Sequence, residues 1–463
     1  MTLSRAMVSR PVMVRAARAF PSLAAPSGVM LGVACALGHP GTALAQTSVL
    51  GRLASTAPGF NTLIEPVLAP DYMRDHNIGV LDEEHPDYDA VGAAIGSFTL
   101  KPQVTLGVVG DNNVFLTDIA HKGDVSAVLK PGFLLASDWS RHSLQLQGNA
   151  DLRRYASQTV ANQNAWDIFP SGEMNLGRNF VLHAEGRVGN YGESPYSSDQ
   201  NPEAQVLSRF FRTGELLKGT YTRGRVRLTG AYDHSAYSYA TLRYPDGRTA
   251  DQRYRNRNID RVSGQVEVAL SPSLALYSAV SADKISYPVV QAGSVSQNSS
   301  GQQILAGVSF DLAGVMRGMI GAGFTHRDYQ AAAQPTVSAF SAQARVDFFP
   351  LKRTTVTFTG QRLVQDSTLG SAPYIDSRVT AEVDQSLRQN LIASLEVMAV
   401  DQSYIASSAS RTSKQAHATL RYQASRWLGF QAETIYRTSK VNSLAVGAGY
   451  SDITMGLSMT VRR

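Results

Sequence analysis

The sequence predicts an all-β protein: a transmembrane antiparallel up-and-down β-barrel of about eighteen strands with a short irregular N-terminal segment. Three observations predict this fold. The chain begins with an export signal. Apolar and polar residues then alternate with a period of two, and the connections between the alternating segments are alternately short and long. The expected order is a signal peptide at 1–45, a periplasmic N-terminal segment at 46–96 and the barrel at 97–463.

The export signal is indicated by charge and by small residues. Four arginines and no acidic residue lie within the first 45 positions, and 28-GVMLGVACALG-38 supplies a short apolar core. Ala43 and Ala45 form the A-x-A pattern at which a signal peptidase cuts. We therefore expect the mature chain to begin near Gln46.

A lipid anchor on Cys35 and an anchor helix are two other interpretations of this region. Gly32 stands where a lipidation motif has Leu, and the apolar run is well short of the ~20 residues that cross a bilayer. Both features favour cleavage.

Removal of the signal changes the charge balance and the cysteine count. The mature chain keeps 39 basic and 37 acidic residues, so it is nearly neutral, and no nucleic-acid partner is expected. Cys35, the one cysteine, leaves with the signal. The mature chain therefore cannot form an intramolecular disulfide, ligate an Fe–S cluster or use a thiolate nucleophile.

The segment 46–96 shows no sustained period of either kind. Prolines punctuate 65-EPVLAP-70, and acidic residues gather at 82-DEEHPDYD-89. We expect little regular structure here and a periplasmic position beside the barrel entrance.

From Ser97 onward, the period of two marks the strands. In 415-QAHATLRYQ-423 the apolar Ala, Ala, Leu and Tyr alternate with Gln, His, Thr, Arg and Gln. The same alternation recurs in 143-SLQLQGNAD-151, 179-NFVLHAEGRV-188, 224-GRVRLTGAYD-233, 303-QILAGVSFD-311, 340-FSAQARVDF-348 and 352-KRTTVTFTG-360. Eighteen such segments follow residue 97, and their length suits the ~10 residues of a tilted membrane strand.

The connections between these segments distinguish a membrane barrel from a soluble sandwich. Every second connection is short: 138-DWSR-141, 176-LGRN-179, 222-TRGR-225, 270-LSPSL-274, 312-LAGVM-316, 350-PLKR-353, 386-SLRQN-390 and 426-RWLG-429. The intervening ones are mostly long and polar, such as 191–205, 241–258 and 287–301. Outer-membrane barrels sort their connections in this way, with short periplasmic turns and long extracellular loops. Trp139 and Trp427 fall at the short-turn end, where an aromatic girdle is expected.

Charged residues on the polar phase of the strands are the pore-lining candidates. An arginine at mid-depth on the lipid side costs ~2–4 kcal/mol, so these residues should face a wet lumen. The candidates are Glu185, Arg187, Arg225, Arg227, Arg345, Asp347 and Arg421. Two interpretations stay open: a lumen solvated by mixed charge, or an arginine-rich track that hydrogen-bonds sugar hydroxyls and attracts uronate or phosphate groups of a passing polymer.

Three short polar residues, Asp111, Asn112 and Asn113, end the apolar run near the outer end of the first strand. Leu116 occupies the position where a calcium loop has Gly. The polar residues either turn the chain or line the wall there, or they have a ligand or loop-anchoring role. No metal, cofactor or catalytic residue is expected, since no histidines pair at metal spacing and no catalytic motif is present.

The region around these residues also carries a resemblance to a known family. The stretch 85-HPDYDAVGAAIGSFTLKPQV-104 has the family's Pro-Asp-Tyr-Asp approach, its Gly-Ser-Phe entry and its proline in the first strand. The stretch 111-DNNVF-115, which ends in Val114 and Phe115, is similar to its Asp-Asp-Asn-Val-Phe signature, and the similarity continues through 131–155. The chain thus resembles the β-barrel porins of proteobacterial outer membranes that are often linked with exopolysaccharide loci.

This resemblance implies a barrel in the outer membrane of a Gram-negative bacterium that helps polysaccharide to leave the cell. The expected partners are outer-membrane lipid, the barrel-assembly machinery, a polysaccharide substrate and a periplasmic polysaccharide export protein. A general diffusion porin for small solutes is the first alternative. A barrel enzyme acting on lipid and a surface adhesin follow it.

Two positions depart from the family pattern. Asn112 replaces the second Asp of the signature, which argues against a cation site there. The chain ends in Arg462-Arg463 instead of the terminal aromatic residue that outer-membrane insertion favours, which indicates a weaker assembly signal.

Overall fold

The computed structural model describes most of the chain from residue 78 to the C-terminus. The described ranges are 78–193, 208–244, 247–290, 295–312, 314–366, 373–405, 407–443 and 446–463. The expected signal peptide and the first part of the N-terminal segment, 46–77, lie outside them.

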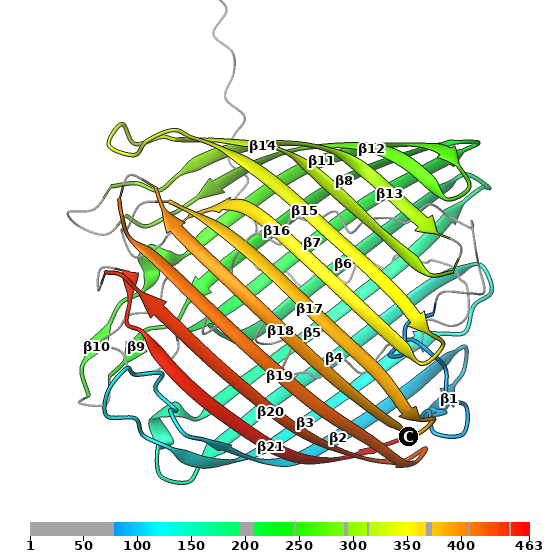
Figure 1. Ribbon diagram of the computed structural model, residues 1–463, viewed down its shortest axis with the longest axis horizontal. Coiled ribbons are helices and arrows are strands. Elements are labelled where there is room, and N and C mark those ends of the chain that lie inside the picture. The colour runs from blue at the N-terminus through cyan, green and yellow to red at the C-terminus, as the bar shows by residue number, and fades with distance from the viewer. Residues whose placement is uncertain are drawn as a thin grey trace, which may run out of the picture. The chain divides into compact units, whose positions relative to one another are not determined.

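Eighteen antiparallel strands form a closed barrel (Figure 1), which confirms the predicted fold class and strand count. The barrel strands are β2 (Phe98–Asp111), β3 (Asp124–Ser137), β4 (His142–Tyr155), β5 (Gln163–Leu176), β6 (Phe180–Gly192), β7 (Arg209–Arg223), β8 (Val226–Tyr239), β11 (Arg257–Ser271), β12 (Leu274–Ser286), β13 (Ser299–Leu312), β14 (Met316–Tyr329), β15 (Val337–Leu351), β16 (Thr354–Gln365), β17 (Tyr374–Arg388), β18 (Leu391–Tyr404), β19 (Ser410–Ser425), β20 (Leu428–Val441) and β21 (Tyr450–Arg462). Each pairs with the next along the chain, and β21 pairs with β2 to close the ring.

The remaining described elements are short. They are β1 (Ala93–Ile95), β9 (Leu242–Arg243), β10 (Thr249–Ala250), and the 3-10 turns η1 (Thr159–Ala161) and η2 (Arg253–Arg255). Among the described residues, no helix is long and apolar enough to cross a membrane.

The connections are sorted between the two ends of the barrel as the sequence predicts. All eight short turns fall at the end that carries the C-terminus, at the right in Figure 1. Trp139 and Trp427 lie in two of these turns, and the Trp139 ring packs edge-on against Phe98 with 5.4 Å between the centroids. Because short turns are periplasmic in outer-membrane barrels, this end is the periplasmic one.

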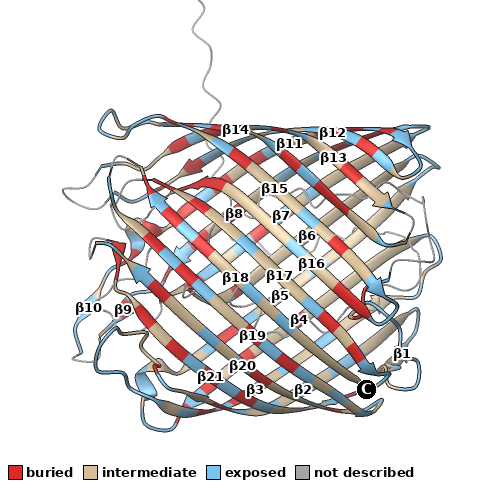
Figure 2. Ribbon diagram, viewed as in Figure 1, coloured by how far each residue is buried: buried red, intermediate tan, exposed pale blue. Residues whose placement is uncertain are grey.

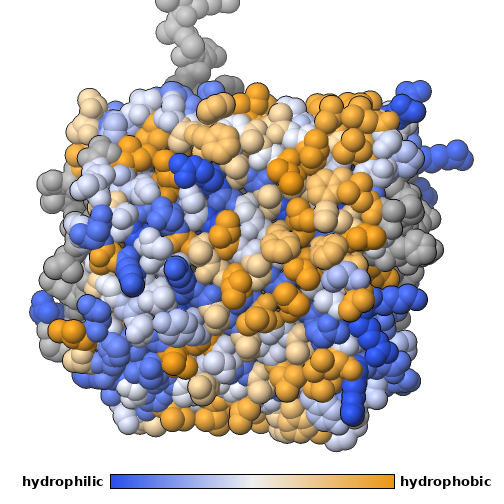
Figure 3. Space-filling view, in the orientation of Figure 1, coloured by the Kyte–Doolittle hydropathy of each residue, from blue (hydrophilic) through white to orange (hydrophobic). Residues whose placement is uncertain are grey.

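Alternation along each strand separates an outer from an inner face (Figure 2). In β11, Val262, Val266 and Val268 are exposed, whereas the residues between them are buried or half-buried. The exposed phase is apolar on the other strands too, and apolar side chains spread over the outer face in Figure 3. An apolar outer face is what a lipid-facing barrel requires, so the opposite phase faces the lumen.

The closing seam between β2 and β21 runs from Gln103, opposite Arg462, to Asp111, opposite Thr454. The pairing with β21 does not include the first five residues of β2. There β1 pairs instead, with Ala93 opposite Leu100 and Ile95 opposite Phe98. Part of the N-terminal segment expected to be irregular thus covers a strand edge.

Candidate functional site

The lumen wall contains six of the seven pore-lining candidates. Arg187 and Glu185 lie on the inward phase of β6, Arg227 on β8, Arg345 and Asp347 on β15, and Arg421 on β19. Arg225 does not belong to the wall. It lies in the two-residue turn formed by Gly224 and Arg225, one position before β8 begins. Gly224 has a φ of 59°, which allows this tight turn.

Arg345 is the most accessible of these cations, with 57% of its side chain exposed. Its Nε lies 3.4 Å from Oδ1 of Asp347, whose other oxygen is 3.1 Å from Nε of Arg317. The hydroxyl of Thr357 also donates to Asp347. One carboxylate thus contacts two guanidinium groups, and the more exposed of them, that of Arg345, can be reached by a solute.

Arg227, by contrast, is neutralised by an acidic partner within the wall. Its guanidinium lies 3.2 Å from Glu267, and both side chains are only 4% exposed. The hydroxyl of Ser309 donates to the same carboxylate at 2.9 Å. A buried pair of this kind contributes neither net charge nor a free donor to the lumen.

The candidates on β6 and β19 are half-buried. The guanidinium of Arg187 lies 5.1 Å from the centre of the Phe169 ring, and Glu185 lies 2.7 Å from His183. Arg421 interacts electrostatically with acidic residues of the adjacent strand β20 and of β17, two strands away. These are the inward-facing Glu382, Asp384 and Glu433.

The acidic residues of β17 and β18 were missed in the sequence, although the same alternation places them in the lumen. Glu382 and Asp384 lie two positions apart on the inward phase of β17, and Glu396 faces them from β18. Nε2 of Gln415 donates to Glu396 at 3.0 Å. The wall from β15 to β20 therefore carries charge of both signs.

One arc of the barrel, β8 and β11–β14, is tightly packed on its inner side. A Cβ added to Gly321 would lie 1.9 Å from the hydroxyl oxygen of Tyr277, and one added to Gly307 would lie 2.1 Å from the carbonyl oxygen of Ile320. The Tyr277 ring occupies the space that these glycines leave empty. Glycine here permits a close approach of the chain.

The extracellular end of the lumen carries a layer of buried aromatic side chains that sequence reasoning also missed. They are Tyr155, Tyr191, Phe210, Tyr237, Tyr239, Tyr287, Tyr374, Tyr404 and Tyr450, all below 9% exposure. Each lies on the inward phase within two residues of the extracellular end of its strand. The recurrence of Tyr beside the long loops is the sequence pattern from which this layer could have been predicted.

Arginine and loop residues complete this layer. The guanidinium of Arg255, 1% exposed, lies 4.1 Å from the centre of the Tyr239 ring. It forms an ion pair with Glu193 and donates to Gln252 at 2.7 Å. The connection between β8 and β11 is thereby held inside the mouth, and we refer to these packed residues as the outer layer.

The N-terminal segment lies along the periplasmic rim. The backbone N–H of Val80 donates to Thr355 of β16 at 2.9 Å, Arg426 donates to the carbonyl of Pro86, and Arg462 donates to the carbonyl of Tyr88. This stretch carries exposed acidic side chains, namely Asp82, Glu83, Glu84 and Asp87. Four acids are thus presented at the periplasmic opening.

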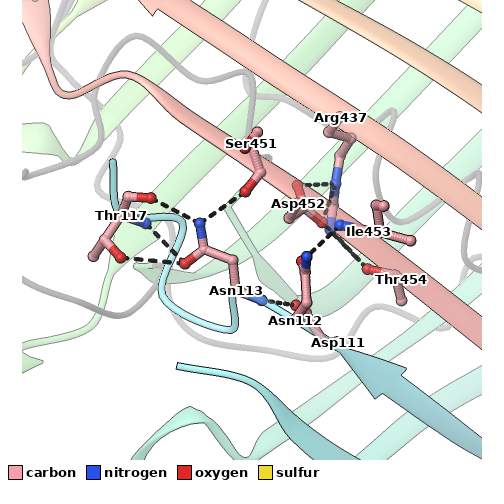
Figure 4. A network of polar contacts seen from close by, with 9 residues as sticks. All are labelled: Asp111, Asn112, Asn113, Thr117, Arg437, Ser451, Asp452, Ile453 and Thr454. Carbon is pink, nitrogen blue, oxygen red and sulfur yellow. Dashed lines mark hydrogen bonds and ion pairs between the residues drawn. The ribbon is translucent and has the colours of Figure 1, made fainter. Parts of the chain in front are cut away.

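The family signature lies at the opposite end of the seam (Figure 4). Asn112 continues the ladder: its backbone N–H donates to the carbonyl of Ile453, and its side-chain Oδ1 accepts from the N–H of Ile453 at 2.7 Å. Asn113, 0% exposed, donates to the carbonyls of Thr117 and Ser451 and accepts from the N–H and hydroxyl of Thr117.

The geometry therefore gives Asn113 a loop-anchoring contact, one of the two interpretations left open. Asp111 helps by accepting from the N–H of Asn113 at 2.8 Å. Within the loop, the N–H of Val114 donates to the carbonyl of Lys122, whose ammonium lies 5.8 Å from the Phe115 ring centre. Among the described residues, no group of three or more His, Cys, Asp or Glu side chains is placed to hold a metal ion.

Three solved structures match the chain at low sequence identity and with TM-scores below 0.5. OccAB3 of Acinetobacter baumannii has 10% identity and a TM-score of 0.43, over 80% of this chain and 100% of that one. A BenF-like porin of Pseudomonas fluorescens Pf-5 has 11% identity and a TM-score of 0.43, over 79% and 99%. OccK5 (OpdH) of Pseudomonas aeruginosa has 12% identity and a TM-score of 0.42, over 80% and 99%. No curated protein sequence matches the chain.

A family model provides the stronger comparison. The model described as "Putative beta-barrel porin 2" matches residues 85–463, which is most of the chain and includes the whole barrel. The match begins at the stretch from which the resemblance was read and continues through the closing strand. The chain belongs to this family and is an outer-membrane β-barrel porin of the Gram-negative type.

Proposed function

We propose that this porin is a channel for the export of exopolysaccharide to the cell surface and has no catalytic activity. The observation that carries the proposal is the difference between the two ends of the lumen. At the extracellular end the outer layer buries Tyr239 and Arg255, whereas in the periplasmic half Arg345 reaches solvent. A lumen whose wall is packed at the extracellular end and reaches solvent nearer the periplasm would suit cargo delivered from that side.

The periplasmic rim supports delivery by a partner. The stretch 78–89 is fixed to β16, to the turn after β19 and to β21, so its exposed acids keep a defined position beside the opening. A periplasmic polysaccharide export protein with a basic face would complement them. A diffusion porin needs no such contact.

The inner wall offers chemistry that suits sugars. Arg345 presents a guanidinium group beside the hydroxyls of Thr357 and Thr359 on the adjacent strand. Guanidinium groups bind carboxylate and phosphate groups, and hydroxyls exchange hydrogen bonds with sugar hydroxyls. A polymer carrying uronate or phosphate groups fits this wall better than an uncharged apolar solute.

A general diffusion porin for small solutes is the second candidate. The exposed guanidinium group of Arg345 favours it as well, because one accessible cation on a polar wall gives anion preference in a simple pore. The outer layer separates the two candidates, since a diffusion porin should conduct without a partner.

Deletion of the gene tests the proposal directly. We expect loss of extracellular polysaccharide with uptake of small sugars unchanged, and restoration of secretion by the intact gene. Normal secretion in the deletion strain, with no second copy present, would refute the export role and leave the diffusion porin as the better account.

Charge neutralisation at the rim tests the route of delivery. The variant converts four rim acids to amides: D82N, E83Q, E84Q and D87N. The matched control converts four exposed acids at or near the extracellular end: D118N, D251N, D328N and D401N. We expect reduced secretion from the rim variant only, at equal barrel abundance. Equal secretion from both variants would exclude these acids as a partner contact.

A further inference from the structure

Two arginines converge on the lipid-facing wall at its extracellular edge. Arg154, exposed, ends the outward phase of β4, and Arg209, half-buried, begins that of β7. Nη1 of Arg154 donates to the carbonyl of Gln163 at 2.9 Å. Nη2 of Arg209 donates to the carbonyl of Asn162, the residue before Gln163. Both guanidinium groups therefore lie over one turn at the start of β5, where their like charges interact.

No acid balances this pair within the part of the chain that the structure describes. Arg154 donates otherwise to the carbonyl of Arg153 and to Oδ1 of Asn164, and all of these partners are uncharged. An arginine has five N–H donors, and contacts with the described residues use three of them in Arg154 and one in Arg209, so donors remain for a ligand. Two adjacent guanidinium groups without a counter-charge repel each other, and an anion between them removes the repulsion.

Aromatic side chains lie next to the arginine pair on the membrane side. Trp166 and Phe211 project from the same outer face, 38% and 40% exposed, with 6.2 Å between their ring centres. Trp166 is two residues beyond Asn164 on β5, and Phe211 is two beyond Arg209 on β7, in both cases toward the middle of the membrane. Ile168 continues the apolar surface one step deeper.

This arrangement sets the arginine pair at the level of lipid headgroups. Trp and other aromatic rings of a barrel mark the boundary between acyl chains and headgroups. A cation directly outside such rings meets the polar groups of the outer leaflet. The other two tryptophans lie at the periplasmic end, so Trp166 marks the opposite boundary.

We propose that Arg154 and Arg209 together bind a phosphate group of an outer-leaflet lipid, whose acyl chains lie on Trp166 and Phe211. Guanidinium groups bind phosphate through paired N–H donors, and two of them can hold one phosphate from both sides. The site depends on the outer-membrane position of the barrel and not on the export role. It does not involve the lumen.

Fluorescence of Trp166 provides the test. The full mature chain is purified in detergent in a W139F/W427F background, which leaves Trp166 as the one tryptophan. It is titrated with a bis-phosphorylated glycolipid with brominated acyl chains, and separately with the same lipid after removal of both phosphates. We expect quenching of Trp166 at a lower concentration of the phosphorylated lipid.

Four variants define the outcome. R154Q/R209Q should raise the half-saturating lipid concentration about tenfold, as expected for the loss of charge-assisted contacts, and should leave the phosphate-free titration unchanged. R154K/R209K should keep most of the binding. The matched control K414Q/K440Q removes two outward cations near the extracellular ends of β19 and β20 and should have no effect. R209Q alone should weaken lipid binding less than the double variant does. It replaces the double variant in the test if R154Q/R209Q does not fold.

Three results would overturn the proposal. The first is unchanged lipid binding in both R209Q and R154Q/R209Q. The second is a loss of binding in K414Q/K440Q equal to that in R154Q/R209Q. The third is equal quenching of Trp166 by the phosphate-free lipid. Competition by inorganic phosphate at the lipid concentration would show that the site takes a free anion instead of a lipid headgroup. A folded barrel changes its gel mobility on heating, so a variant without this change is misfolded and is set aside before titration.

Discussion

The side-chain amide of Asn113 donates to the carbonyl oxygen of Ser451 at 2.9 Å and so joins the loop after the first barrel strand to the last one. The two residues are 338 positions apart in the sequence. The same amide group satisfies both carbonyl and N–H groups of Thr117. One buried side chain therefore fixes both the loop and the extracellular end of the seam.

Replacement of Asn113 should destabilise the barrel. N113A leaves half-buried carbonyl and N–H groups without this partner, and each such group costs up to about 1–3 kcal/mol in unfolding free energy. N113D should cost at least as much, because a carboxylate cannot donate to the two carbonyls. Urea unfolding in lipid vesicles measures the difference. T117V, which loses one 3.2 Å contact, is the control and should cost less; equal midpoints for all variants would contradict the anchoring role.

Ion selectivity should depend on Arg345 more than on any other candidate. The quadruple replacement of Arg187, Arg227, Arg345 and Arg421 by Glu should shift the selectivity in planar bilayers toward cations, because the charge of the wall is inverted. R345E alone should produce a large part of that shift, since this side chain is the exposed one.

R227Q/E267Q is the matched control for selectivity. It should leave the reversal potential nearly unchanged, since it removes both charges of a balanced pair. R227Q alone should lower stability, because an unpaired buried carboxylate costs about 3–5 kcal/mol. Unchanged selectivity in a folded quadruple variant would place all four residues outside the constriction.

Loosening the outer layer should raise conductance. E193Q/R255Q removes the buried ion pair that holds the connection between β8 and β11 inside the mouth. Single-channel recording should then show more frequent or larger openings. D251N/R253Q removes an exposed pair from the same connection, with side chains 54% and 71% exposed, and should have no effect. Equal conductance in all three proteins would mean that this ion pair does not limit passage.

The glycines beneath Tyr277 should tolerate no side chain. G321A places a Cβ 1.9 Å from the hydroxyl oxygen of Tyr277, and overpacking of this kind costs about 1–3 kcal/mol. Unfolding midpoints measure the cost. G321A/Y277F removes the clashing oxygen and should recover part of it, whereas G230A, where a Cβ meets open space, is the neutral control.

The mature protein should begin near Gln46 and fractionate with the outer membrane. The basis is the arginine-rich leader and the A-x-A pattern that ends at Ala45. N-terminal sequencing of the membrane fraction measures this. An intact Met1, or recovery as a soluble periplasmic species, would contradict it.

Much of the fold was predictable because it depends on local periodicity. Each strand repeats every two residues, and the outward phase must be apolar, so the strands and their facing could be read from single segments. The turn lengths then gave the orientation. Arg225 was misplaced because the period of two continues through Gly224 without marking where β8 begins.

The burial and the ion-pair partner of each lumen residue could not be predicted in the same way. Arg227 and Arg345 have the same place in the alternation, yet one is buried against Glu267 and the other is exposed. The difference lies in the register of neighbouring strands, which the sequence does not give. The pairing of Glu193 with Arg255 likewise joins two long connections that share no local signal.

The three-residue strand β1 has a consequence for the size of the pore. The diameter of a barrel depends on the stagger that accumulates around the ring as well as on the strand number. That stagger is set where the last strand meets the first. A slide of β21 by two residues toward the periplasm would keep every side chain on its proper face, so alternation alone cannot prevent it.

Such a slide is blocked because β1 already occupies the edge of β2 at Phe98–Leu100. Arg463 meets Pro102 directly beside it, where its N–H donates to the Pro102 carbonyl at 3.1 Å. β1 therefore limits how far β21 can slide along β2 when the barrel closes. The register of the seam, on which the calibre of the channel depends, is thus limited by a three-residue strand that is not one of the eighteen strands of the wall.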